Sequence, residues 1–321
     1  MARMRYMQAF AQALRDEMAA DPRVVVLGED VRQSLRRVTY GLVEEFGPQR
    51  VLDTPLSEQA FTGFATGAGL AGWRPVVEYQ IPTLLYIAYD QIVNQAAKLR
   101  LMSGGQAAVP VTYVIPGSGA RRGLAGQHSD HPYAMLVQAG VKTVVPGSVD
   151  DAYGLLRSAI RDDDPVAVFA PAAALGFRQE LTELHPVPLG QGRIHRPGTD
   201  VTVVAVGHLV ADALAVAEEV APEISVEVFD PRTLLPFDWD LLVESVGRTR
   251  RLVVYDDTNR SCGLAGEIVA TVCEQVDLAS RPRRVTRADV PVPFTPDLEL
   301  AMLPDRDSLR QTIRASVGAV S

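Results

Sequence analysis

Residues 53–80 read DTPLSEQAFTGFATGAGLAGWRPVVEYQ. In this stretch Ser57 is a residue type that caps helices, and Glu58 follows it in the position of a first helical turn. The apolar run that ends at Glu78 has the length and the bounds of a buried strand. A strand end, a helix and a second buried strand in this order are typical of a parallel sheet, with Glu58 at the carboxyl edge of that sheet.

The same alternation of helical and buried-strand patterns extends through most of the chain. Apolar residues recur at helical spacing over 7–18, and the run at 24–27 predicts a buried strand. The alternation weakens and then resumes in the second half of the chain. We therefore expect an α/β fold with two three-layer α/β/α domains, at 1–180 and 200–321, joined by a linker at 181–199.

Composition excludes several classes of protein. The 321 residues carry a formal net charge of −8, whereas a nucleic-acid surface needs a basic face. No apolar run is long enough to cross a bilayer, and no secretory signal is apparent, so we expect a cytoplasmic protein without membrane or nucleic-acid partners. Two cysteines, Cys262 and Cys273, cannot build a disulfide framework, and we expect both to be buried packing residues.

Residues 67–72 read GAGLAG, which matches the glycine spacing of a dinucleotide-binding turn. That turn needs a strand before it and a helix after it, so that helix amides face a pyrophosphate. Here a helical pattern precedes the glycines and a strand pattern follows them. We therefore interpret these glycines as small residues that let a helix pack closely, and we expect no NAD.

His128 and His131 lie with Asp130 in a glycine-rich loop after an apolar run at 111–115. Two imidazoles and a carboxylate are metal-ligand types, but no HExxH helix or cysteine pair accompanies them. We expect instead that one of these histidines faces a substrate. The alternative is a loop histidine that bonds only to backbone.

Three segments, at 53–58, 72–98 and 116–131, together resemble the beta subunit of the heterotetrameric 2-oxoacid dehydrogenases of the pyruvate, branched-chain and acetoin type. The likeness continues at 229–238 and 289–294, and so covers nearly the whole chain. These beta subunits belong to the transketolase superfamily. The resemblance implies a pyrimidine-binding, transketolase-like domain followed by a transketolase C-terminal domain.

The resemblance also implies thiamine diphosphate as cofactor and assigns roles to single residues. Glu58 stands where the family's glutamate shares a proton with the ring nitrogen of the aminopyrimidine, and such a carboxyl should be buried. His128 stands at the position of the active-site histidine. Gln80, Leu84 and Tyr86 would complete the cofactor-binding residues. Leu84 departs from the usual Phe or Tyr and so loses ring stacking, for which Tyr86 would compensate.

Arg121 and Arg122, with His131, are candidate substrate-binding residues. Paired arginines suit phosphate or carboxylate through forked hydrogen bonds, although surface arginines or contacts to a partner subunit fit them equally. A bound phosphate would indicate a different function, a transketolase-like transfer of a two-carbon unit from a ketose phosphate to a carrier. A third hypothesis is a non-catalytic scaffold subunit, which Glu58 argues against and Leu84 mildly favours.

The family's diphosphate-binding motif, a Gly-Asp-Gly followed by Asn-Asn, does not occur in this sequence. The resemblance therefore implies an alpha-type subunit that supplies the Mg²⁺ ligands, in an α2β2 assembly with a second copy of this chain. The acyl group formed from a 2-oxoacid would pass to a lipoyl or other acyl carrier protein. The family also often has a potassium site, and the matching residues here are Val111, Ala159, Ile160, Asp162 and Asp164.

Overall fold

The computed structural model describes residues 2–120, 123–181 and 183–318. The chain divides into two compact units, with 1–121, 127–189 and 234–236 in unit 1 and the remainder in unit 2. Each unit is a sheet with helices, which confirms the predicted α/β fold class. The division between the units falls at 189/190, inside the stretch predicted as a linker, and the predicted domain limits stay a prediction.

In the first part of the chain the described residues form the strands β1 Ala2–Arg5, β2 Val24–Gly28, β3 Val51–Asp53, β4 Arg74–Glu78, β5 Thr112–Ser118, β6 Lys142–Val144, β7 Val166–Pro171 and β8 Arg178–Leu181. Its helices are α1 Tyr6–Ala20, α2 Leu42–Phe46, α3 Glu58–Leu70, α4 Leu84–Asp90, α5 Lys98–Met102, α6 Tyr133–Gln138 and α7 Val149–Arg161. A π-helical segment at Gln91–Ala97 joins α4 to α5, and 3-10 turns occupy Gly126–His128 and Ala172–Gly176.

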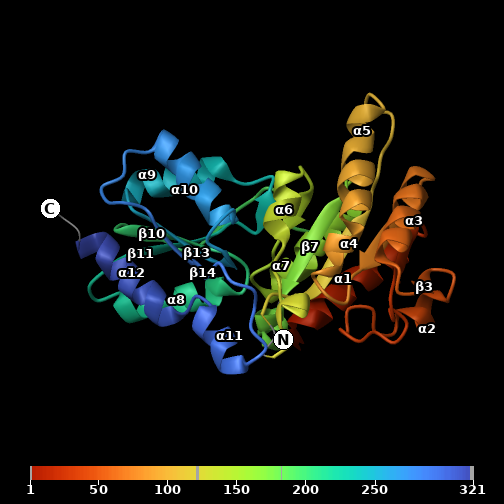
Figure 1. The fold of residues 1–321 in the computed structure, drawn as a ribbon, viewed down its shortest axis with the longest axis horizontal. Coiled ribbons are helices and arrows are strands. Elements are labelled where there is room, and N and C mark those ends of the chain that lie inside the picture. Colours follow the sequence, from red (N-terminus) through yellow and green to blue (C-terminus); the bar gives the residue numbers. More distant parts are fainter. Residues whose placement is uncertain (1, 121–122, 182, 319–321) are drawn as a thin grey trace. The chain divides into compact units, whose positions relative to one another are not determined.

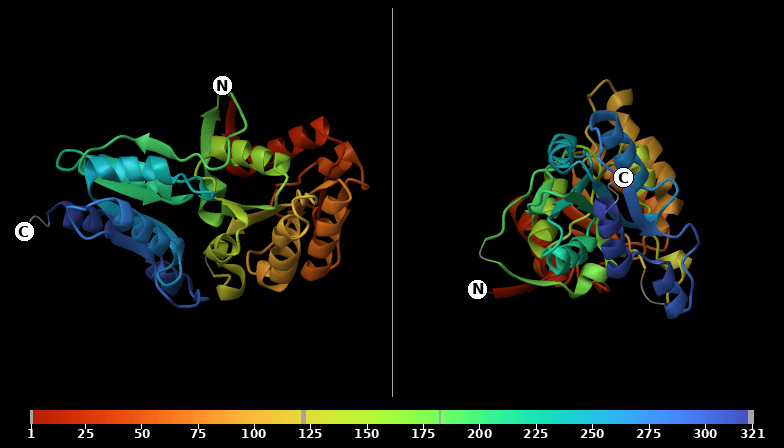
Figure 2. Two further views of the ribbon diagram at one scale, coloured as in Figure 1. Left: turned by 90° about the horizontal axis from the view of Figure 1, so that it is seen from above. Right: turned by 90° about the vertical axis from the view of Figure 1, so that its left-hand side faces the viewer.

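The main sheet of unit 1 has the strand order β12-β6-β7-β5-β4-β2-β3, where β12 is Thr233–Leu235. The pairings from β6 to β3 are all parallel. Side chains of β2 such as Val24 and Val26 pack with α1 and α7, and α3 packs against β4 and the α4–α5 segment. Helices therefore cover both faces of the sheet, as Figures 1 and 2 show.

Unit 2 contains β9 Arg193–Arg196, β10 Val201–Ala205, β11 Val226–Asp230, β13 Leu252–Asn259 and β14 Arg283–Arg287, in the order β14-β13-β10-β11-β9. Its helices are α8 Leu209–Val220, α9 Trp239–Thr249, α10 Leu264–Gln275, α11 Pro296–Met302 and α12 Arg306–Gly318. Helices α8 and α12 share a core with one face of the sheet, and α9 and α10 contact the strands from the other (Figure 1).

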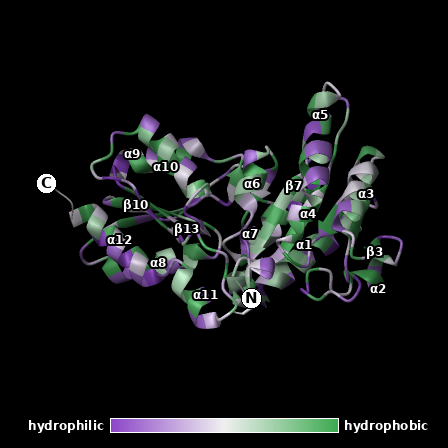
Figure 3. Ribbon diagram, viewed as in Figure 1, coloured by the Kyte–Doolittle hydropathy of each residue, from purple (hydrophilic) through white to green (hydrophobic). Residues whose placement is uncertain are grey.

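Burial explains why these segments form strands. All five residues of β2 and of β10 are buried, so each strand is hydrophobic on both faces, as a central parallel strand between helix layers must be. Figure 3 shows the contrast with the helices, which carry both hydrophobic and hydrophilic residues. None of the helices in the described part of the chain combines the length and the apolar character that a membrane crossing needs.

Two sequence interpretations have clear outcomes in the fold. Gly67 and Gly69 lie within α3, and β4 follows that helix, so the predicted order of helix before strand is confirmed. A Cβ on Gly69 would lie 3.4 Å from Pro110, in ordinary packing contact. The burial predicted for Cys262 and Cys273 is wrong, because both are exposed. Cys262 lies in the turn before α10, and Cys273 lies on the solvent side of that helix.

Candidate functional site

Four loops or helix starts meet the carboxyl ends of neighbouring parallel strands in unit 1. Glu29 follows β2, Glu58 begins the helix after β3, Gln80 follows β4, and residues 127–131 come after β5 in the chain. In the sheet these strands are adjacent, in the order β5-β4-β2-β3. Ligands of open parallel sheets bind at this edge, so the candidate site lies there.

Glu58 is the first residue of α3 and its side chain is buried, with 7% exposed. Its carboxylate has no hydrogen-bond partner among the residues that the structure describes, although its backbone oxygen accepts from Thr62. A carboxylate in the first turn is favoured by the helix dipole. The charge of Glu58 also contributes to raising the pKa of Glu29, after burial and Asp30. The carboxylate of Glu58 is thus positioned at the start of α3 and can still accept a hydrogen bond from a ligand.

Glu78, the last residue of β4, and Gln80, which follows that strand, form a buried polar pair. Gln80 Nε2 donates to Glu29 O at 3.0 Å and to Glu78 Oε1 at 3.2 Å. Burial raises the pKa of Glu78 to about 7, and hydrogen bonds and the Arg36 charge offset this only in part. Gln80 Oε1 is buried without a hydrogen-bond partner in the described structure. An unmatched buried acceptor at the sheet edge is suited to a donor from a bound molecule.

The loop that carries the histidines is attached to the start of α4. Thr83 Oγ1 donates to Gln127 O, and Tyr86 Oη donates to Asp130 Oδ2 at 2.9 Å. His128, in the 3-10 turn, is half-buried. These bonds place Tyr86, a predicted cofactor-binding residue, next to the histidine loop. Leu84, which is half-buried, lies in the same turn of α4.

His131 is more deeply placed than His128. It is 7% exposed, and its ring centroid lies 5.5 Å from that of Tyr133. Gly119 has a φ of +86°, and a Cβ at that position would overlap the His131 ring. A glycine is therefore required where the β5 loop passes this imidazole. The other candidate substrate residues, Arg121 and Arg122, lie outside the described residues.

Several polar groups at the sheet edge were not predicted from the sequence. Glu29 and Glu78 were not singled out, and neither was the pair formed by Thr62 Oγ1 and Tyr79 Oη, which lie 2.5 Å apart. Burial raises the pKa of Tyr79 well above its usual value. One signal was available, because Glu78 is a charged residue at the end of an otherwise apolar strand.

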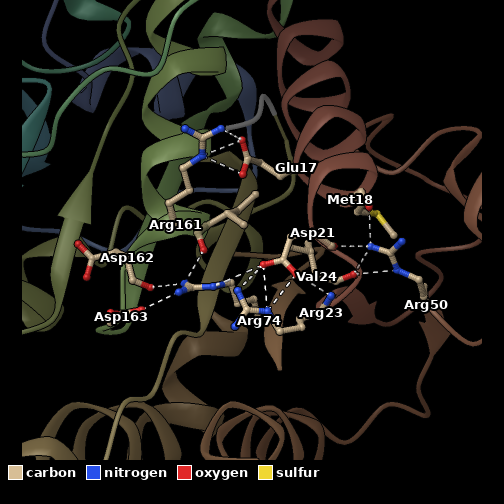
Figure 4. Close-up of polar contacts among 11 residues, drawn as sticks. Glu17, Met18, Asp21, Arg23, Val24, Arg50, Arg74, Arg161, Asp162 and Asp163 are labelled. Carbon is tan, nitrogen blue, oxygen red and sulfur yellow. Dashed lines mark hydrogen bonds and ion pairs between the residues drawn. The ribbon is translucent and has the colours of Figure 1, made fainter. Parts of the chain in front are cut away.

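Four of the candidate potassium ligands lie at the end of α7 or in the turn before β7, and Val111 directly precedes β5. Their oxygens have other partners. Arg74 Nη1 donates to Ile160 O at 3.1 Å and to Asp162 O at 2.9 Å. Figure 4 shows this guanidinium among the carbonyls and carboxylates. Ala159 O accepts from Asp162 N, and Val111 O accepts from Val166 N.

The two candidate carboxylates are also neutralised from within the chain. Lys142 Nζ lies 2.8 Å from an Asp162 oxygen and 3.0 Å from an Asp164 oxygen. Arg100 Nη1 lies 2.6 Å from Asp164, and the pKa of Asp164 is lowered by these two cations in spite of its burial. Three protein cations thus contact the oxygens of Ile160, Asp162 and Asp164, so this donor set is a poor fit for a potassium ion.

Comparison with known proteins agrees with this architecture. Residues 2–177 match the transketolase pyrimidine-binding domain and residues 190–309 match the transketolase C-terminal domain. A solved structure titled split gene transketolase, inactive beta4 tetramer, aligns with a TM-score of 0.80 over 97% of both chains, at 22% identity, and so supports the fold alone. The fold and the domain matches define a chain of the transketolase superfamily.

Relatives with higher sequence identity identify the family within this superfamily. The chain is 40% identical to acetoin:2,6-dichlorophenolindophenol oxidoreductase subunit beta of Bacillus subtilis (strain 168), over 94% of this chain and 93% of the relative. It is 38% identical to the pyruvate dehydrogenase E1 component subunit beta of Rickettsia felis, over 96% of each. The chain belongs to the family of beta subunits of the 2-oxoacid dehydrogenase first component, which confirms the resemblance drawn from the sequence.

Proposed function

We propose that this chain is the beta subunit of a thiamine-diphosphate-dependent 2-oxoacid dehydrogenase, with its half of the active site at the carboxyl edge of the unit 1 sheet. The observation that carries the proposal is the buried carboxylate of Glu58, which has no protein partner in the described structure and begins the helix after β3. The family membership supports the same cofactor.

The residues of the site suit the pyrimidine half of the cofactor. Glu58 would hold a proton at the ring nitrogen of the aminopyrimidine, and Gln80 Oε1 offers an acceptor for an N–H donor. Leu84 would supply an apolar contact to the ring. Thiamine diphosphate, when bound, supplies a nucleophilic carbon that also accepts electrons as carbon dioxide leaves. His128, His131 and Tyr86 would orient the substrate and the acyl acceptor.

An alpha-type subunit would bind the diphosphate. The sequence lacks the Gly-Asp-Gly and Asn-Asn motif, so the proposal places the Mg²⁺ ligands on that subunit and makes this chain active only with it. The active unit would be α2β2, and a lipoyl carrier would take the acyl group. The proposal includes no potassium ion, because Arg74, Lys142 and Arg100 already bond to the candidate ligands. Placement in the cytoplasm stays a prediction.

The experiment that tests the proposal co-expresses the chain with an alpha-type partner from the same genome. The assembled protein, with thiamine diphosphate and Mg²⁺, is assayed with pyruvate, branched-chain 2-oxoacids and acetoin, and in parallel with xylulose 5-phosphate, using an artificial electron acceptor. We expect turnover of one of the first group. Turnover of the sugar phosphate alone would support the transketolase-like alternative, and no turnover with any donor would support the scaffold hypothesis.

A further inference from the structure

A basic cavity of about 680 Å³ lies within unit 2, lined by parts of α10, α12 and β14. Its volume falls within the range of roughly 300–1,000 Å³ that is usual for small-molecule sites. Four of its lining residues are arginines, at positions 260, 281, 283 and 284, and none is acidic. In a chain with a net charge of −8, such a set is a local reversal of charge.

Two of these arginines each donate a hydrogen bond to the backbone of the other. Arg260 Nη1 donates to Arg284 O at 3.4 Å, and Arg284 Nη1 donates to Arg260 O at 3.0 Å. This reciprocal contact holds both side chains in place and leaves most of their N–H groups unused, because each guanidinium has five. The unused N–H groups are available to the oxygens of a bound anion.

The other two arginines have no competing partners. The side chains of Arg281 and Arg283 are exposed and make no hydrogen bond or ion pair with any residue that the structure describes. The nearby carboxylate of Asp289 accepts from Ser261 N and Oγ, at 2.9 and 2.6 Å. Ser261 holds the pKa of Asp289 below its usual value, with smaller contributions from the backbone N–H and the charge of Arg260. This carboxylate therefore partly balances Arg260 and leaves Arg281 and Arg283 as the arginines without a partner in the described chain.

Protection of a sheet edge is the simpler explanation for arginines on β14, which is the edge strand of its sheet. It does not account for the cavity beside them. The α10 wall of the cavity is formed by small residues, Gly266 and Ala270, together with Val269. A Cβ on Gly266 would already lie 3.4 Å from Arg284 Nη1, so a larger side chain there would fill the space.

We propose that this cavity binds a nucleoside di- or triphosphate. The forked N–H groups of arginine match phosphate oxygens two at a time, and four such groups balance the charge of a triphosphate. The remaining wall, with Val269, Ala270 and Pro282, is suited to the less polar base and sugar. The site lies within unit 2 and does not depend on the proposed function of unit 1.

The test is calorimetric titration of the full-length chain with ATP, inorganic triphosphate and thiamine diphosphate, without added metal, at two salt concentrations. We expect one saturable ATP site per chain that weakens with salt, as binding to exposed cations must. Inorganic triphosphate should bind more weakly than ATP. Equal or tighter binding of triphosphate or of thiamine diphosphate would overturn the nucleotide assignment, and no saturable binding would overturn the site.

Variants locate the binding. Arg281→Gln with Arg283→Gln should weaken ATP binding by about tenfold or more, because charged hydrogen bonds are lost. The matched control is Arg178→Gln, an exposed arginine on the edge strand β8, which should bind as the wild type does. Ala270→Glu should weaken binding more than the equally large Ala270→Gln, since only the carboxylate repels phosphate. Equal affinity in the arginine double variant and the wild type would contradict the proposal.

Discussion

Glu78 carries a carboxyl that the fold buries at the end of β4, and its charge state links the site to stability. Its pKa is raised from 4.5 to about 7, chiefly by burial. The folded chain therefore keeps a proton that the unfolded chain loses as the pH rises above 4.5. The contribution of Glu78 to the free energy of unfolding should therefore fall by about 3 kcal/mol between pH 4.5 and pH 7, and it should stay level above pH 7.

The variant Glu78→Gln removes this titration. Between pH 5 and pH 8 the wild type should lose stability that the variant keeps. We therefore expect the free energy of unfolding of the variant, relative to that of the wild type, to rise by roughly 2–3 kcal/mol over this range. Urea unfolding at both pH values measures it. Other titrating groups, such as Asp257, whose pKa burial also raises to about 7, cancel in this comparison. A difference that does not change with pH would mean that Glu78 is already charged in the folded chain.

The residues of the site differ in whether the sequence alone could predict their positions. Glu58 was placed at the carboxyl edge of the sheet from local pattern, because a strand end followed at once by a helix start is contained in a short stretch of sequence. Ser57 does stand at the N-cap of α3, but its side chain makes no capping hydrogen bond. Gln80 was assigned to the cofactor only by the family resemblance. The approach of Gln80 to Glu29 could not be predicted, since it depends on the pairing of β2 with β4 across 51 residues of chain. The burial of Cys273 was wrong because α10 turns that position to solvent.

Helices and strands with a strong hydrophobic period were predicted from the sequence, whereas a strand with a weak period was not. The helical spacing predicted over 7–18 lies within α1, and the strand predicted at 24–27 is extended by one residue in β2. By contrast β14 was missed, because its sequence RRVTR has a single apolar residue and is stabilised by pairing with β13. Short elements of this kind depend on tertiary contacts rather than on their own composition.

The junction between α7 and β7 depends on Arg74, whose side chain is only 16% exposed. Arg74→Met would leave the Ile160 and Asp162 carbonyls without this donor, and we expect a loss of about 1–3 kcal/mol of stability in urea unfolding. The control Arg23→Met removes an arginine that is 58% exposed and should cost under about 1 kcal/mol. Equal losses in the two variants would contradict the role given to Arg74.

The same junction predicts independence from potassium. A potassium site with a Kd near 1 mM would add about 2.7 kcal/mol of stability at 100 mM salt. We expect instead the same thermal midpoint in potassium chloride and in choline chloride at equal ionic strength, because Arg74, Lys142 and Arg100 already bond to the oxygens. A midpoint that rises with potassium concentration alone would show that the ion still binds there.

On the scale of the whole molecule, the proposed function requires a second kind of subunit. The chain holds residues suited to the pyrimidine ring but lacks the sequence motif for the diphosphate and its cation. We expect thiamine diphosphate with Mg²⁺ to bind the isolated chain at least about tenfold more weakly than the assembly with an alpha-type partner, as half a site provides half of the contacts. Titration calorimetry of both samples measures this, and equal affinities would place the whole cofactor site on one chain.

The central claim is that the Glu58 carboxyl holds a proton at the aminopyrimidine ring, so that the reactive carbon of the cofactor can lose its own. The most direct measurement is deuterium exchange at that carbon, followed by quenched-flow NMR in the assembled protein with wild-type or Glu58→Gln chain. We expect the substitution to slow exchange by roughly 100-fold or more, the usual worth of a positioned acid or base, while the cofactor still binds. Exchange at the wild-type rate in a cofactor-saturated Glu58→Gln protein would contradict the account.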